Sequence, residues 1–352
     1  MLIFTNRAMT NQADASAFGT SYQPAAERLG LAHVRPGSRS SPWTVSDVNG
    51  EASDEQALSE LLPLFAGPRP VLVHLHGNNN TPTSCFERSA LFESIYDLEV
   101  IGFSWPSEGY RPDGSRLDMT LESSGDESNL RAADRANRPS DFIQDKIQRY
   151  HQAKTNAKNS IDALARFLRL LGVARLAANG QPFSVAAHSL GVHFLQNTLA
   201  VSGAVESLGT AHNIALLAAC ARAAGHREWL ARLHPRGQIF VTFNNRDLVL
   251  AGAFFADNEE IKLGDRPGAE LLQSPSMRYI DFTGASNDAF NHNYFVAGAL
   301  KGKKKRVLRR IFASESDIQP GELPRKVYPV GCDKSVLTCF MAAPQPRDGG
   351  GP

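Results

Sequence analysis

The chain has 352 residues, of which 42% are hydrophobic and 21% charged, and this composition excludes a wholly disordered protein. The formal net charge of +1 points to no strongly acidic or basic partner. No apolar run approaches the roughly 18 residues that a membrane span requires, and no basic region precedes the short apolar stretch at the N-terminus. We therefore expect a cytoplasmic protein with one decorated domain.

Apolar runs in the first third of the chain predict four strands. The stretches "LIFTN" (2–6) and "WTVSDV" (43–48) have Gly- and Pro-containing turns between them, and we expect both to be edge strands. The runs Val71–Leu75 and Val100–Phe103 are continuously apolar, and the first ends in a polar loop with glycine. Such runs are typical of buried parallel strands.

A polar insertion and a helical region are predicted next. Residues 109–140 are rich in Gly, Pro and Ser and poor in large apolar side chains, which indicates a mobile or cap-forming insertion. From Phe142 to Leu171 apolar residues return at helical spacing, so one long helix or two helices should follow. Gly172 is the predicted stop.

The second half of the chain alternates strand and helix patterns. Its predicted elements are strands in "FSVAAHS" (183–189), "NIALLAAC" (213–220), "QIFVTF" (238–243) and "MRYIDFT" (277–283), and helices in "LGVHFLQNTLAVS" (190–202), "HREWLARL" (226–233) and from "NHNYFVAGALKG" (291–302). This alternation predicts a parallel α/β sheet.

A serine stands where the strand at 183–189 must turn directly into a helix. Such a turn holds the hydroxyl of Ser189 at the carboxyl edge of the sheet and aims a helix N-terminus at it. It requires small residues two positions before and after, and these are Ala187 and Gly191. The alternative is that Ser189 only caps the helix.

A nucleophilic serine needs a base, and the base needs an orienting carboxylate. On a sheet of this kind the chain order is Ser, Asp or Glu, then His, each on a loop after a strand. Asp247 and His292 follow the strands at 238–243 and 277–283 and satisfy this order. The competing residues are Asp257, Glu259, Asp265, Asp288, His226 and His234.

The developing oxyanion of such a reaction needs two N–H donors. One is expected to be the amide of Leu190, which follows the serine, and the other that of Asn78 or Asn79 in the polar loop after the strand at 71–75. The alternative for His76 and Gly77 in this loop is a plain strand-ending turn.

At these residues the sequence resembles the α/β-hydrolase superfamily, and more narrowly a bacterial branch of uncharacterised esterase/lipase-like hydrolases. The similar segments are "MLIFTNR", "VHLHGNNN", "GFSWPSEG", "YHQAKTNAKNSIDALARFL", "AAHSLG", "NNRDLVL" and "NHNYF". The resemblance implies a mostly parallel central sheet with helices on both faces and an inserted cap-like segment. Ala187 departs from the commoner glycine of the serine motif, and the insertion and the tail after Leu300 are less familiar.

The resemblance also implies site roles: Ser189 as nucleophile, Asp247 as acid and His292 as base. It implies that Trp105, next to Pro106, forms a wall of the substrate pocket. The other predicted pocket residues are His76, Gly77 and His188.

The function expected from these residues is hydrolysis of carboxylic esters through an acyl-enzyme, without a metal or cofactor. The partner would be a small-molecule or lipid ester. A lipase or phospholipase and an acyl thioesterase are alternatives with the same machinery. A non-catalytic binding module of the same fold is the alternative from another class.

A basic run and a Pro-rich tail complete the chain. The run Lys301–Arg310, with apolar residues through Phe312, indicates either a helix face beside the core or a contact with an anionic membrane, whereas nucleic acid is less favoured. We expect a hydrolase domain over 1–313 and a partly disordered extension over 314–352.

The four cysteines match no metal-ligand spacing. They are Cys85, Cys220, Cys332 and Cys339. Without an export signal they are expected to be reduced thiols, and a Cys332–Cys339 disulfide remains an alternative.

Overall fold

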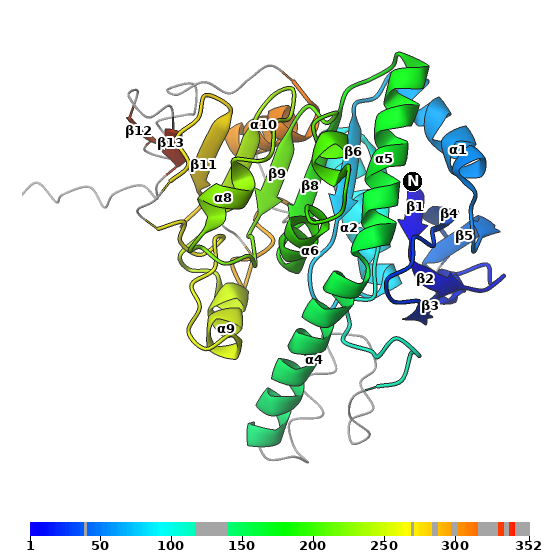
Figure 1. Cartoon of the computed structure of the whole chain (residues 1–352), viewed down its shortest axis with the longest axis horizontal. Helices are drawn as coiled ribbons and strands as arrows, with labels where there is room; N and C mark the ends of the chain where they lie inside the picture. The colour runs from blue at the N-terminus through cyan, green and yellow to red at the C-terminus, as the bar shows by residue number, and fades with distance from the viewer. Residues whose placement is uncertain are drawn as a thin grey trace, which may run out of the picture.

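A nine-stranded sheet forms the centre of the molecule (Figure 1). The computed structural model describes residues 1–38, 41–116, 139–268, 271–283, 288–296, 302–315, 330–333 and 338–341. Across the sheet the strands are β11 (Met277–Asp281), β10 (Ile239–Phe243), β9 (Ile214–Leu217), β8 (Phe183–His188), β6 (Val71–Leu75), β7 (Glu99–Ser104), β1 (Leu2–Thr5), β4 (Gly30–Pro36) and β5 (Trp43–Asn49).

The sheet is mostly parallel. Strands β1, β7, β6, β8, β9, β10 and β11 pair in parallel, and β4 is antiparallel to both of its neighbours. The carboxyl ends of the parallel strands therefore meet at one edge, where the loops that carry a site would gather.

Helices cover both faces of the sheet. The helices are α1 (Asp54–Ala66), α2 (Pro82–Tyr96), α4 (Pro139–Asn159), α5 (Ile161–Ala178), α6 (Leu190–Thr198), α7 (Ala204–Leu208), α8 (His226–Leu230), α9 (Leu248–Ala256) and α10 (Lys303–Phe312), with a short 3-10 turn at Ala15–Ala17. In Figure 1, α5, α6 and α8 lie in front of the sheet, and α2 and α10 lie behind it. The predicted fold class, a mostly parallel sheet between helices, is confirmed.

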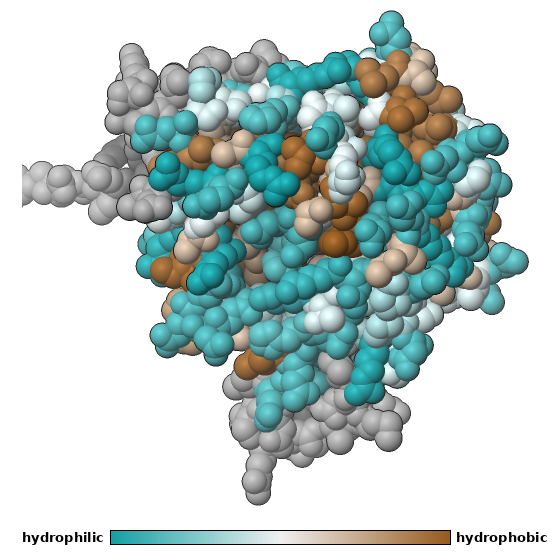
Figure 2. Space-filling model, in the orientation of Figure 1, coloured by the Kyte–Doolittle hydropathy of each residue, from teal (hydrophilic) through white to brown (hydrophobic). Residues whose placement is uncertain are grey.

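The surface in front of the sheet is mostly hydrophilic. Figure 2 shows teal over most of this face and a hydrophobic area near the upper end of α5. On that helix Val173 and Leu176 are 44% and 57% exposed.

The pairing of β1 differs from the prediction. Strand β5 lies at an edge as expected, but β1 lies inside the sheet, between β7 and β4. The sequence did not predict β4. In this strand the partly buried His33 interrupts the buried residues Leu31, Ala32 and Val34. A short, mixed pattern of this kind gives only a weak strand signal in the sequence. In the structure β4 nevertheless pairs with β1 and covers its outer edge.

The helical region after the insertion forms two helices, and Gly172 does not end the second. Helix α5 continues to Ala178 and stops at Asn179, which adopts the left-handed conformation with φ 45°. A Cβ atom on Gly172 would lie 3.1 Å from Oγ1 of Thr210. Gly172 therefore permits close packing, and Asn179 supplies the helix stop. Most of the predicted insertion, 117–138, lies outside the described residues.

The basic run forms α10, whose apolar side faces the core. Residues 291–296 form bends and turns and not the beginning of the predicted helix, and α10 begins at Lys303. Leu308, Ile311 and Phe312 are fully buried, and the Phe312 ring packs edge-on against Tyr96 at 5.1 Å. The apolar stripe is thus buried against the core, and contact of the charged side chains with a membrane stays a prediction.

Among the described helices, none combines the length and apolarity needed to cross a bilayer.

Two small sheets lie outside the central one. Strands β2 (Arg7–Met9) and β3 (Phe18–Tyr22) form one, and β12 (Val330–Asp333) and β13 (Thr338–Met341) form the other. Cys332 stands opposite Cys339 in the register of β12 and β13, whose side chains lie outside the described residues, so reduced thiols stay the prediction and the disulfide its alternative. Cys85 and Cys220 are free and buried.

A buried ion pair fixes the loop after β7. Arg7 has a fully buried side chain, whose Nη2 donates to Oε2 of Glu108 and to the carbonyl of Trp105, both at 2.6 Å. Its Nη1 donates to the carbonyl of Gly19 at 3.2 Å. Arg7, in β2, therefore joins the hairpin of β2 and β3 to the loop after β7.

Replacing Arg7 by methionine should lower the free energy of unfolding by about 3–5 kcal/mol, because Glu108 would be left as an unpaired buried charge. The control is Arg69→Met, which removes the partly exposed ion pair with Glu99 and should cost at most about 1 kcal/mol. Urea unfolding measures both. Equal losses in the two variants would contradict a structural role for the buried pair.

Candidate active site

Ser189 occupies a strained turn between β8 and α6. Its φ of 53° and ψ of −120° are unusual for a residue with a side chain, and such a conformation costs on the order of 1–3 kcal/mol. The N–H of Ser189 donates to the carbonyl of Leu217 at 2.9 Å, and its carbonyl accepts from Cys220 N–H at 3.0 Å. The end of β9 therefore holds the turn on both sides.

The hydroxyl of Ser189 does not cap the helix that follows it. No bond joins the Ser189 side chain to the first-turn amides of α6. The alternative of a simple helix cap is therefore wrong. The hydroxyl stays at the N-terminus of α6, where the helix dipole favours negative charge.

Small residues allow the turn to pack against the loop after β6. A Cβ atom on Gly191 would lie 2.6 Å from the carbonyl oxygen of His76 and 2.7 Å from that of Leu75. A Cβ atom on Gly77 would lie 2.8 Å from Cβ of Ser189. Backbone atoms cannot yield easily, so both glycines are needed for this approach.

Asp247 and His292 form a buried pair. His292 Nδ1 lies 2.6 Å from Oδ2 of Asp247, and the two side chains are 7% and 0% exposed. The other oxygen of Asp247 caps α9 by accepting from Val249 N–H at 3.0 Å and Leu250 N–H at 2.9 Å. The carboxylate fixes Nδ1 as the protonated nitrogen, which leaves Nε2 of His292 as a proton acceptor.

The backbone around His292 is held from two sides. Oδ2 of Asp288 accepts from the N–H of His292 at 2.9 Å. The hydroxyl of Tyr294 contacts Oγ1 of Thr242 at 2.5 Å and accepts from Ala218 N–H at 3.1 Å. The sequence noted Asp288 only as a competing acid and missed Tyr294.

The imidazole of His292 lies beside the serine turn. Its ring centre is 4.6 Å from that of His188, the residue directly before Ser189. His188 is buried, and burial holds the pKa of its imidazole well below the ordinary value. His188 therefore stays neutral and adds no charge beside the Asp247–His292 pair.

The competing residues have other contacts. Asp257 pairs with Lys154 and Lys262, and Asp265 pairs with Arg266. His226 is buried and bonds the hydroxyl of Tyr279 at 2.8 Å. The remaining competitors, Glu259 and His234, are exposed.

Asn79 is not a suitable oxyanion donor. Its N–H donates to the carbonyl of Ser107 at 2.9 Å and is therefore committed. The N–H groups of Asn78 and Leu190 have no acceptor in the part of the chain that the structure describes. Of the two asparagine amides that the sequence suggested, only that of Asn78 remains.

His76 and Trp105 support the loop after β6. The indole N–H of Trp105 donates to the His76 carbonyl at 3.0 Å, and its backbone N–H donates to Nε2 of His76 at 3.1 Å. The rings stack with centres 5.5 Å apart, and burial lowers the pKa of His76 to about 3. Because neither side chain is exposed, we assign both to loop support and not to the predicted pocket wall.

Comparison with known proteins identifies the family. The model of the family described as "Alpha/beta hydrolase of unknown function (DUF900)" matches residues 51–300, a range that contains Ser189, Asp247 and His292. Searches of curated proteins and of solved structures found no match. In the described residues, no group of three or more His, Cys, Asp or Glu side chains could hold a metal ion.

Replacing Gly191 by alanine should lower the free energy of unfolding by about 3 kcal/mol, because the new Cβ meets two backbone carbonyls. The control is Gly252→Ala in α9, where an added Cβ meets nothing within 4 Å. It should raise stability by about 0.5–1 kcal/mol. Denaturant unfolding tests both variants, and an unchanged stability of Gly191→Ala would contradict the close packing.

Proposed function

The chain belongs to this family of α/β-hydrolases, and we propose that it is a serine hydrolase that cleaves carboxylic esters. The observation that carries the proposal is the strained Ser189 with its uncapped hydroxyl. Strain of this kind persists where function requires it. The buried Asp247–His292 pair supplies the base that an alcohol nucleophile needs.

Acylation uses both parts of the site. Oγ of Ser189 attacks the acyl carbonyl carbon, and Nε2 of His292 takes the hydroxyl proton. Asp247 remains ionised and stabilises the imidazolium. The N–H groups of Leu190 and Asn78 bind the oxyanion, where one donor contributes about 3–4 kcal/mol to the transition state.

Loss of the alcohol completes acylation, and attack by water then carries out deacylation. His292 gives its proton to the leaving alcohol as the carbon–oxygen bond breaks. It then takes a proton from water, which attacks the acyl-enzyme, and returns that proton to Ser189 as the acid leaves. No step of this chemistry requires a metal or an organic cofactor.

One observation favours a second candidate, the hydrolysis of lipid esters. Leu248 and Val249, directly after Asp247, are 58% and 41% exposed, and Phe290, two residues before His292, is 54% exposed. The N–H of Leu248 donates to the Phe290 carbonyl at 3.0 Å, so these segments are adjacent. Apolar side chains beside the acid and the base suit an ester with an apolar part.

Replacing Ser189 by alanine should reduce hydrolysis of p-nitrophenyl butyrate by a factor of about 10⁴ or more, because the nucleophile is absent. Initial rates with the purified variant measure this loss. Ser207→Ala, which changes a serine at the end of α7, is the control and should keep full activity. Full activity of Ser189→Ala would place the reaction elsewhere. A folded wild-type protein that hydrolyses no ester would favour the binding-module alternative.

Replacing Asp247 by asparagine should reduce kcat by about 10⁴-fold, because the amide would impose the wrong tautomer on His292. The amide oxygen can still accept from Val249 and Leu250, so Tm should change little. Steady-state kinetics and thermal unfolding separate the two effects. Asp265→Asn, at the ion pair with Arg266, is the control, and an unchanged kcat in Asp247→Asn would remove Asp247 from the reaction.

A further inference from the structure

A second cavity lies apart from the proposed ester site. Its volume is about 470 Å³, within the range of small-molecule sites, and none of Ser189, Asp247 and His292 lines it. Its walls come from α4, α6, α8 and the segments that follow β9 and α9. The charged residues in the lining are Lys154, Lys158, Arg222, Arg232, Lys262 and Glu260.

The cavity carries an excess of positive charge. Lys262 and Arg222 share Glu260, with ion pairs of 2.8 and 2.9 Å. Lys154 and Lys262 also pair with a second carboxylate, Asp257. Two acids therefore pair with three of the five cations of the lining, and one of these acids, Asp257, lies outside the lining.

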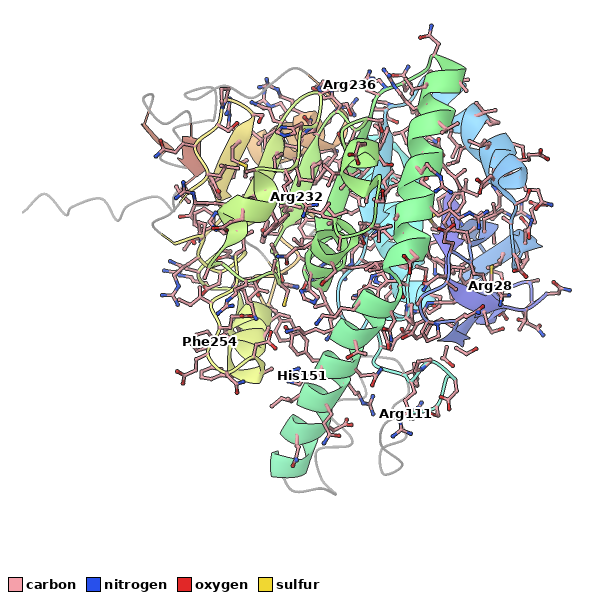
Figure 3. All side chains as sticks on the ribbon, in the orientation of Figure 1. Arg28, Arg111, His151, Arg232, Arg236 and Phe254 are labelled. Carbon is pink, nitrogen blue, oxygen red and sulfur yellow. The ribbon has the colours of Figure 1, made fainter. Side chains whose placement is uncertain are left out.

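In the part of the chain that the structure describes, two of the five cations have no carboxylate partner. Lys158 is exposed and makes no ion pair within the described residues. Arg232, labelled in Figure 3, donates from Nη2 to the carbonyl of Leu199 at 2.7 Å. Both side chains therefore remain available to an anion.

A buried donor in the lining also lacks an acceptor. Trp229 is 7% exposed, and its indole Nε1 has no hydrogen-bond partner among the described residues. An unmet buried donor costs about 1–3 kcal/mol. Because an indole N–H can only donate, the missing partner must be an acceptor.

His193 lies in the same wall, and both burial and nearby positive charge affect its imidazole. Its Nε2 is likewise buried without a partner in the described chain. Burial, and then Lys154 and Lys158, lower the pKa of this imidazole to about 4. His193 is therefore neutral at pH 7 and can offer a donor or an acceptor without adding charge.

We propose that this cavity binds a small molecule through a phosphate group. Phosphate supplies a negatively charged partner for Lys158 and Arg232. Its oxygens are also acceptors for the N–H of Trp229. The cavity is larger than a phosphate ion, so the natural ligand carries an organic part as well. This site does not depend on the proposed ester hydrolysis.

The cavity shares two segments with the serine turn. Helix α6 begins directly after Ser189 and carries His193 on its outer side. Cys220 lines the cavity, and its N–H donates to the carbonyl of Ser189 at 3.0 Å. A ligand in the cavity therefore rests against the segments that hold the turn.

Isothermal titration calorimetry of the whole chain with inorganic phosphate and pyrophosphate, at constant ionic strength in chloride, tests the site. The expected result is saturable binding of one anion per chain. Lys158→Gln and Arg232→Gln should each weaken it about tenfold through loss of a charge-assisted contact. Arg236→Gln is the control, because this exposed arginine lies well above Arg232 in Figure 3 and does not line the cavity.

Trp229→Phe keeps an aromatic ring and removes the N–H. Its Tm without phosphate should equal or exceed that of wild type, and its phosphate affinity should fall. Ser189→Ala should bind phosphate as wild type does. No saturable binding to wild type, equal binding in every cavity variant, or loss of binding in Ser189→Ala would each overturn the proposal.

Discussion

The sharp turn from β8 into α6 is the constraint on which the rest of the site depends. Ser189 keeps a positive φ because its backbone is bonded to Leu217 and Cys220 on the neighbouring strand end. Packing against the loop after β6 adds a second restraint, and it is possible only because Gly77 and Gly191 lack side chains. Two parallel neighbours of β8 thus hold a conformation that the chain alone would avoid.

The parallel sheet also positions the proposed base and the proposed acid. Asp247 follows β10 and His292 follows β11, so their loops emerge at the edge where the serine turn lies. Both oxygens of Asp247 are used, because one caps the start of α9 and the other lies against Nδ1 of His292. The stacked rings of His76 and Trp105 restrain the loop after β6. These contacts leave little freedom to the groups that would react.

The sequence was sufficient to predict the parts that depend on local pattern. The strands β6, β7 and β8 are mostly apolar runs, Ser189 and Asp247 stand just beyond strand ends, and His292 follows the last strand of the central sheet. These features require no knowledge of distant contacts.

The position of β1 inside the sheet was missed because it depends on pairing with β4, whose own pattern is weak. The amide of Asn79 and the ring of Trp105 were misassigned because their partners, Ser107 and His76, are distant in sequence. The basic cavity was not predicted either, since separate segments build it.

The measurement that tests the central claim most directly is intact mass and peptide mapping after incubation with a fluorophosphonate. This probe reacts with serines that a base and an oxyanion hole activate. We expect a single adduct, located on Ser189, because Ser189 lies at the N-terminus of α6 and the ring of the preceding residue, His188, packs against that of His292. No adduct on the folded protein, or an adduct on another serine, would contradict the assignment of Ser189 as the nucleophile.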